Sequence, residues 1–110
     1  MPAKFVLKKI KNGEVKFNLH AANGEIILSS ESYKQKSSAK RGIASVQKNC
    51  ENDSRYDRRE NRSKKPYFVL RAANSKIIGQ SEYYSTPAMM EKGIKAVMKA
   101  GSTTAVEDLT

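Results

Sequence analysis

The side chains that could support catalysis are few and lie far apart in this sequence. His20 is the only histidine and Cys50 the only cysteine among 110 residues. A general base or a nucleophile needs a second group within hydrogen-bond reach, and neither residue has an evident partner in its segment. We therefore assign no catalytic, metal-binding or cofactor-binding residue, expect no cofactor, and predict that the protein is not an enzyme. A reactive thiol at Cys50, activated by Lys48, is the alternative.

Two glutamates recur in the same short motif, Ser-Glu-x-Tyr, at residues 30–33 and 81–84. One interpretation places Glu31 and Glu82 as paired carboxylates across a symmetry axis. The other is structural, because serine and glutamate often bond free backbone groups where a strand leads into a helix. We favour the structural interpretation, and we expect Tyr33 and Tyr84 to bury their rings beneath a helix.

Positive charge is the one unusual property of the composition. Lysine and arginine number 21 against 11 acidic residues, which gives a net charge of +10. The densest basic segment is "RYDRRENRSKK", and its candidate phosphate contacts are Arg55, Arg58, Arg59, Arg62, Lys64 and Lys65. The alternatives are protection of a sheet edge and solubility, since no recognised nucleic-acid motif is present. Nucleic acid, or another polyanion, is the candidate partner.

A tandem repeat organises the chain. Residues 17–50 shifted by 51 positions fall on residues 68–101, with 14 identities in 34 positions and no gap. Two copies are too few for a solenoid. The sequence therefore predicts one domain, residues 1–110, made of two repeats at about 1–53 and 54–110. Internal pseudo-twofold symmetry predicts a monomer.

Each repeat reads as strands followed by a helix. The segments "FNLHA" and "FVLRA" alternate apolar and polar residues, which is typical of a half-buried strand. Asn23 and Asn74 follow and predict tight turns, and we expect Asn74 to carry the strain where Ser75 replaces Gly24. Apolar stripes at helical spacing come next, and Gly42 and Gly93 within them suggest close packing of helix on sheet.

These motifs resemble the YegP-like family of uncharacterised bacterial proteins, in its duplicated form. The resemblance rests on "F-x-L-x-A-A-N" at 17–23 and 68–74, "G-I-x-x-V" at 42–46 and 93–97, and the "VEDLT" ending. It implies an α+β fold in which two β-β-β-α-β units form one antiparallel sheet, with two helices on one face and C-terminal strands exchanged between the repeats. It implies no reaction, because none is established for the family.

The remaining expectations concern location and role. No window approaches the ~20 apolar residues of a membrane helix, the N-terminus lacks a signal-peptide core, and the single cysteine cannot form an internal disulfide. We expect a small cytoplasmic protein without a membrane partner. Its role is predicted to be interaction, with non-specific binding of nucleic acid through lysine and arginine as the alternative.

Overall fold

Seven strands and two helices make up the fold. The computed structural model describes residues 3–110. The elements in chain order are β1 (Lys4–Lys9), β2 (Val15–His20), β3 (Ile26–Ser29), α1 (Lys36–Asn49), a 3-10 turn η1 (Asp53–Arg55), β4 (Tyr56–Glu60), β5 (Pro66–Arg71), β6 (Ile77–Gln80), α2 (Pro87–Ala100) and β7 (Val106–Asp108). The expected α+β class is confirmed.

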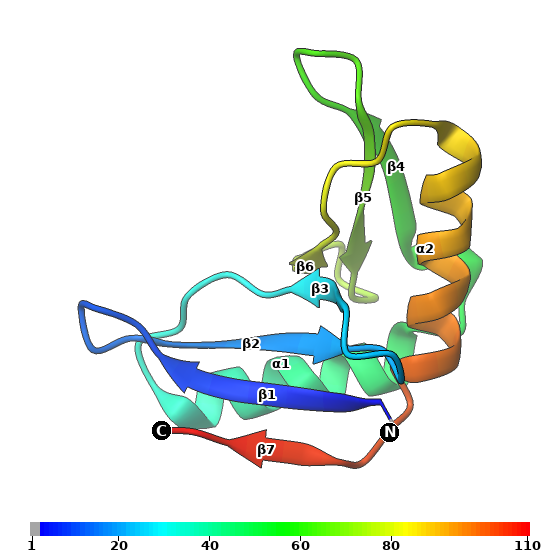
Figure 1. Cartoon of the computed structure of the whole chain (residues 1–110). Helices are drawn as coiled ribbons and strands as arrows, with labels where there is room; N and C mark the ends of the chain where they lie inside the picture. Colours follow the sequence, from blue (N-terminus) through cyan, green and yellow to red (C-terminus); the bar gives the residue numbers. More distant parts are fainter. Residues whose placement is uncertain (1–2) are drawn as a thin grey trace.

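The strands form one sheet with the order β4-β5-β6-β3-β2-β1-β7. The two halves of the sheet meet where β3 pairs with β6, through the single residue pair Ser29 and Gln80. These residues are related by the 51-residue shift, so the pseudo-twofold axis passes through this seam. Figure 1 shows the halves turned strongly relative to one another, with β1, β2, β3 and β7 in one arm and β4, β5 and β6 in the other.

Both helices cover the same face of the sheet, and each helix reaches across the seam. Helix α1 contacts β2 of its own repeat and also β5 and β6, while α2 contacts β5 and also β2 and β3. Phe17 and Phe68, equivalent in the two repeats, are fully buried beneath the helices. Burying such a side chain contributes roughly 1.5–3 kcal/mol. The two repeats therefore share one core, and its helix side chains are the predicted stripes Ile43, Val46, Ile94 and Val97.

The sheet is mixed, which corrects the expectation of a purely antiparallel one. Strand β7 runs parallel to β1, and the pairing continues on both sides of it: Phe5 N–H donates to the Ala105 carbonyl and Leu109 N–H to the Leu7 carbonyl. Helix α2 ends beside the start of β1, where the Thr103 hydroxyl donates to the Ala3 carbonyl at 3.0 Å. Because only a short link joins α2 to β7, both strands start at the same end of the sheet.

Strand exchange takes a different form from the one expected. Strand β7 follows α2 yet pairs with β1, in the other half of the molecule. In the first repeat, as limited to residues 1–53, no strand follows α1. The chain passes through η1 directly into β4, the strand equivalent to β1. With those limits the exchange is one-way: β7 covers the outer edge of β1, whereas β4, the equivalent of β1, is itself the end strand of the sheet.

The two asparagine turns share one geometry. The side-chain oxygens of Asn23 and Asn74 accept hydrogen bonds from the N–H groups of Glu25 and Lys76, at 3.0 and 3.1 Å. The next residue in each turn has a positive φ, 87° at Gly24 and 70° at Ser75. The expectation that Asn74 carries the strain is therefore wrong, because Ser75 itself takes the left-handed conformation.

Replacing Ser75 by glycine is expected to stabilise the protein. A non-glycine residue in the left-handed region costs roughly 1–2 kcal/mol. Glycine removes this cost, but part of the gain is lost because glycine also raises the conformational entropy of the unfolded chain. Ser75→Gly should raise the free energy of unfolding by about 0.5–1 kcal/mol in urea denaturation. The reverse change in the other repeat, Gly24→Ser, should lower it. If both substitutions changed the free energy of unfolding in the same direction, the turns would not be strained as described.

Candidate nucleic-acid interface

The two signature tyrosines are partly buried and pack against the core. Tyr33 stacks on Phe17, with ring centroids 6.3 Å apart, and Tyr84 stacks on Phe68 at 6.4 Å. A Cβ added to Gly93 would lie 2.2 Å from the Tyr84 hydroxyl oxygen, and one added to Gly42 2.7 Å from that of Tyr33. The mid-helix glycines are thus required by the tyrosines that pass beneath them, and burial raises the pKa of both phenols.

The serines of Ser-Glu-x-Tyr complete the sheet. Phe17 N–H donates to the Ser30 hydroxyl at 2.9 Å, and that hydroxyl donates to the Glu31 carbonyl at 2.8 Å. The second repeat reproduces these bonds at Phe68, Ser81 and Glu82. Each hydroxyl takes the place of a strand carbonyl where the chain leaves the ladder, so the buried backbone stays paired.

The two glutamates do not converge on one site. Glu31 lines a groove beside Ile77 and Gly79, whereas Glu82 lines another beside Ile26 and Leu28. The two grooves adjoin at the seam, where both include Ser29, Ser30 and Gln80, but neither is lined by both glutamates. Within residues 3–110 neither carboxylate makes a hydrogen bond or an ion pair through its side chain. Two carboxylates placed apart in this way are not arranged to share a proton or a metal ion.

His20 and Cys50 occupy unrelated places. His20 lies opposite Lys4 on the helix-free face of the sheet. Cys50 is fully buried, and burial raises the pKa of its thiol, which disfavours the thiolate needed for reactivity. Among the described residues, no three histidine, cysteine, aspartate or glutamate side chains gather as they would around a metal ion.

Cys50 lies against Gly101, the residue at which α2 ends. The φ of Gly101 is −68°, which suits any residue, so the turn itself does not require glycine. A Cβ at Gly101 would instead lie 2.8 Å from the Cys50 sulfur and equally close to the Val97 carbonyl. Cys50 and Gly101 are equivalent in the repeat, so the C-terminal ends of the two helices meet at the pseudo-twofold axis.

The six predicted basic residues are divided by the fold. Arg58 shares the face of β4 with the buried Tyr56 and reaches α2, where it makes two hydrogen bonds to Glu91, at 2.6 and 3.0 Å. Arg59 points to the opposite face and bonds Asp57. Arg55 donates to the Asn49 side chain at 3.2 Å. These three arginines therefore support the structure, and they do not form one surface.

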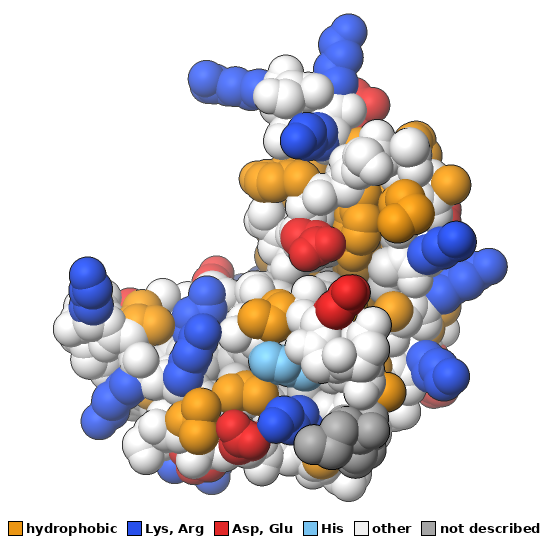
Figure 2. Space-filling view, viewed as in Figure 1, with side chains coloured by type: hydrophobic (Ala, Val, Ile, Leu, Met, Phe, Trp, Pro, Cys, Tyr) orange, Lys and Arg blue, Asp and Glu red, His pale blue; other side chains and the backbone are white. Residues whose placement is uncertain are grey.

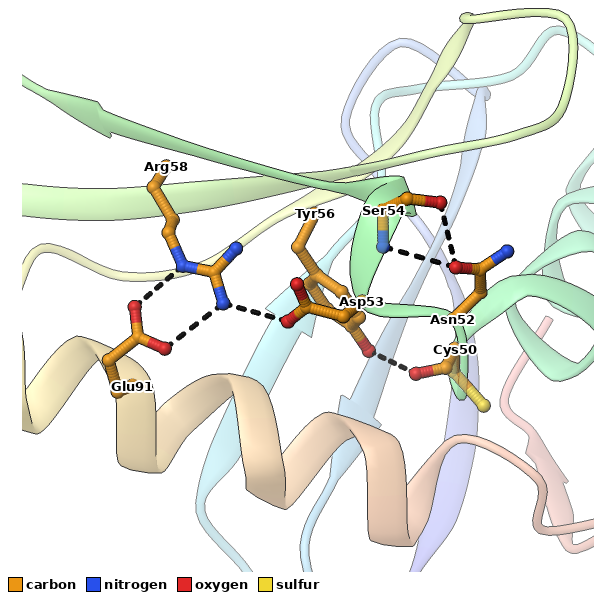
Figure 3. A network of polar contacts seen from close by, with 7 residues as sticks. All are labelled: Cys50, Asn52, Asp53, Ser54, Tyr56, Arg58 and Glu91. Carbon is orange, nitrogen blue, oxygen red and sulfur yellow. Dashed lines mark hydrogen bonds and ion pairs between the residues drawn. The ribbon is translucent and has the colours of Figure 1, made fainter.

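A polar network around Arg58 ties α1, η1, β4 and α2 together (Figure 3). Arg58 also bonds Asp53 at 2.8 Å, and the Tyr56 hydroxyl donates to the Cys50 carbonyl at 2.6 Å. The hydrogen bonds to Glu91 and Asp53 raise the pKa of Arg58, and those from Arg58 lower the pKa of Glu91. Burial raises the pKa of Tyr56. The network therefore connects the segment between the two repeats to both helices.

Arg62, Lys64 and Lys65 remain as free cations. They lie exposed in the loop between β4 and β5, and within residues 3–110 they make no ion pair. Lys64 has a φ of 61°, a left-handed conformation at the tip of the hairpin. This half of the predicted set presents its charge to solvent.

The helix-free face of the sheet carries further cations that the sequence did not single out. Lys8 on β1 stands directly opposite Lys16 on β2, and neither forms an ion pair with any described residue. On the second half of the same face, Arg59 and Arg71 both bond Asp57 and lower its pKa. The signal available in the sequence was strand alternation, since Lys8 and Lys16 alternate with Leu7 and Phe17.

Figure 2 looks onto the helix-free face of the first half and shows blue side chains at both hairpin tips and along the flank formed by α2. The helices contribute Lys92, Lys95 and Lys99 on α2, and Lys40 and Arg41 on α1. Positive charge therefore surrounds the molecule and is not confined to one stripe. What distinguishes the helix-free face is a directly opposed lysine pair that makes no ion pair with the described residues.

Comparison with known proteins shows which family the chain belongs to. A family model described as a domain of unknown function, DUF1508, matches twice, at residues 11–57 and 61–108. The chain belongs to the DUF1508 family. The matched stretches comprise β2-β3-α1 with the first two residues of β4, and β5-β6-α2-β7, so each match ends in the strand after the helix. The repeat limits expected from the sequence, about 1–53 and 54–110, divide the chain before β4.

Relatives at high identity carry the family name UPF0339. The chain is 53% identical over 106 residues to the UPF0339 protein YegP of Yersinia pestis, covering 96% of this chain and 95% of that protein. It is 43% identical over 106 residues to YegP of Escherichia coli K12, with 96% of each covered. The expected resemblance to the YegP-like family is confirmed, and these names describe no activity.

Two solution NMR structures share the fold. The UPF0339 protein of Shewanella oneidensis superposes with a TM-score of 0.92 at 47% identity, over 98% of this chain and 92% of that one. The E. coli protein yegP, described as being of unknown function, gives 0.93 at 42% identity, over 98% and 93%. In the chain described here, residues 3–110 contain no helix that is long and apolar enough to cross a membrane.

Adding a methyl group at Gly93 should destabilise the fold despite better helix propensity. Overpacking typically costs roughly 1–3 kcal/mol, against a gain of about 1 kcal/mol for alanine over glycine. Gly93→Ala should lower the free energy of unfolding by up to about 2 kcal/mol. In a Tyr84→Leu background the same change should be neutral or stabilising, because the hydroxyl it meets is gone. A loss that is equal in both backgrounds would contradict the Tyr84 contact.

The Arg58–Glu91 pair should make stability depend on pH. The folded pKa of Glu91 lies below its ordinary value of 4.5, so the stabilisation is present above that value and is lost as pH falls through the lowered pKa. Glu91 is half exposed, so Glu91→Gln should cost about 0.5–1 kcal/mol at pH 7. The difference from wild type should shrink as the pH falls below 4.5. Glu60→Gln, at an exposed carboxylate of β4 without an ion pair, is the control and should change little.

Proposed function

We propose that this DUF1508 protein acts by non-covalent binding and not as an enzyme, and that its ligand is nucleic acid bound without sequence specificity. The observation that carries the proposal is the pair Lys8 and Lys16, which stand opposite each other on the helix-free face and make no ion pair with any residue in 3–110. Like charges directly opposite in a sheet are destabilising by roughly 0.2–1 kcal/mol. A bound phosphate would turn this repulsion into attraction.

The surroundings of the lysine pair support a polyanion as the ligand. The hairpin loop of the other repeat offers Arg62, Lys64 and Lys65 without ion pairs, and the whole chain carries a charge of +10. Such a field draws polyanions from solution and speeds their association. Phosphate contacts of this kind carry no sequence information, in keeping with a surface that has several cations and no groove-reading helix.

Absence of catalysis is part of the proposal. Within residues 3–110, no hydrogen bond joins any two of the side chains of His20, Cys50, Glu31 and Glu82. The proposal also includes a cytoplasmic location. Cys50 is a buried free thiol, and nucleic acid would be available in the cytoplasm.

A salt titration tests the proposal. Binding of a fluorescently labelled oligonucleotide should be measurable at about 50 mM salt and should weaken steeply as salt rises, since counterion release dominates such binding. Lys8→Gln/Lys16→Gln should weaken binding and lower the salt slope by about 1–2. The matched control on α2, Lys92→Gln/Lys95→Gln, removes the same charge elsewhere and should have a smaller effect. No binding at about 50 mM salt, where the attraction is strongest, would refute the proposal.

A further inference from the structure

We infer that Tyr67 and Tyr83 form a stacking site for an unpaired base, so that the ligand is single-stranded nucleic acid. This inference rests on the proposed function and names the class of nucleic acid. The two rings pack edge to face, with centroids 5.2 Å apart and an interplanar angle of 79°. Tyr83 is 52% exposed, so part of its ring is open to solvent beside the more enclosed Tyr67.

The pair stands apart from every other aromatic side chain. The chain has three phenylalanines and five tyrosines, and the remaining six rings belong to the core or pack against it: Phe5, Phe17, Tyr33, Tyr56, Phe68 and Tyr84. Strand alternation explains the placement, because Phe68 points to the helices and Tyr67 therefore points to the helix-free face. An aromatic pair that the core does not use is available to a ligand.

Cations surround the pair on its own face. Arg59 stands directly opposite Tyr67, and two residues before Tyr67 the chain leaves the hairpin loop that carries Arg62, Lys64 and Lys65. Asp57, an acid on this half of the face, is bonded by both Arg59 and Arg71. Glu82 precedes Tyr83 and lines a groove with Ile26 and Gln80, between the two halves of the same face. Figure 2 shows orange side chains directly beside the blue ones of the upper hairpin.

Such a combination suits a single strand better than a duplex. Proteins that bind single strands join cations that follow the backbone to aromatic rings on which bases stack. In a duplex the faces of the bases are already covered by their neighbours, and only phosphates remain within reach. Tyr67 and Tyr83 would therefore add affinity for an unpaired strand and none for a duplex or for a polyanion without bases.

The pseudo-twofold symmetry makes the assignment more specific. The first-repeat equivalents of Arg59, Tyr67 and Tyr83 are Lys8, Lys16 and Ser32. The first half of the face thus offers phosphate contacts alone, while the second half offers both phosphate contacts and stacking. A strand lying along the face would be held electrostatically by β1 and β2 and would place a base against Tyr83 at the other arm.

Substitutions at Tyr83 test the stacking site with matched controls. Tyr83→Leu removes the ring from an exposed loop, whereas Tyr83→Phe keeps it. For an oligothymidylate of about 15 nucleotides, Tyr83→Leu should bind about tenfold more weakly, and Tyr83→Phe should bind as wild type does. Binding of inorganic polyphosphate should be the same for all three proteins. An unchanged affinity of Tyr83→Leu for oligothymidylate would overturn the stacking site while leaving the proposed polyanion binding intact.

A fluorescence measurement gives an independent readout. The chain contains no tryptophan, so Tyr83→Trp introduces a single reporter at the site. Its emission should be quenched by oligothymidylate, through stacking on the bases, and left unchanged by polyphosphate or by a duplex of equal length. Equal quenching by oligothymidylate and polyphosphate would overturn the inference. If neither ligand binds any of these proteins at about 50 mM salt, the proposed function itself is refuted.

Discussion

The seam between β3 and β6 is the constraint on which the whole molecule depends. A single pair of residues, Ser29 and Gln80, joins the two halves of the sheet, and backbone bonding at that one place cannot hold two arms together. The helices provide the connection instead. Each of them packs on strands of both repeats, so neither repeat can bury its apolar face without the other. One hydrophobic core thus extends across the axis, and the chain behaves as one domain.

Close contacts between repeated residues explain why so many of them recur. Gly42 and Gly93 leave room for Tyr33 and Tyr84, which in turn cover Phe17 and Phe68. The serine hydroxyls close the strand ends at the same place in each half. At the axis itself, the Cys50 side chain occupies the space beside Gly101, which has none. The symmetry is broken there because two cysteine-sized residues would not fit.

Outside the core the repeats have diverged, and most clearly on the helix-free face. Lys8 and Lys16 in the first half correspond to Arg59 and Tyr67 in the second. The core positions are under the same packing constraint in both halves, whereas residues on the open face are constrained only by solvent and by what they bind. We therefore assign the binding properties of the protein to the residues of the helix-free face that differ between the two halves.

Much of the fold could be predicted from the sequence, because it depends on local patterns. The 51-residue repeat, the alternating strands and the helical stripes each carry their own periodicity, and they indicated the α+β class, the pseudo-twofold axis and the buried tyrosines. The strain at Ser75 escaped prediction, because which residue of a turn takes a positive φ depends on the side-chain bond that Asn74 makes.

The tertiary structure alone decided the direction of β7, the division of the basic cluster and the gathering of cations and tyrosines on one face. Strand β7 is parallel because α2 ends beside the start of β1. The basic cluster divides because neighbouring residues of a strand point to opposite faces, so Arg58 meets Glu91 while Arg59 meets Asp57. Tyr67 and Tyr83 meet through the pairing of β5 with β6 and the loop that follows.

The sequence by itself determined the local elements and their symmetry, since these follow from residues near one another in the chain. The candidate binding surface depends on long-range pairing and on the bend at the seam, which no local pattern records.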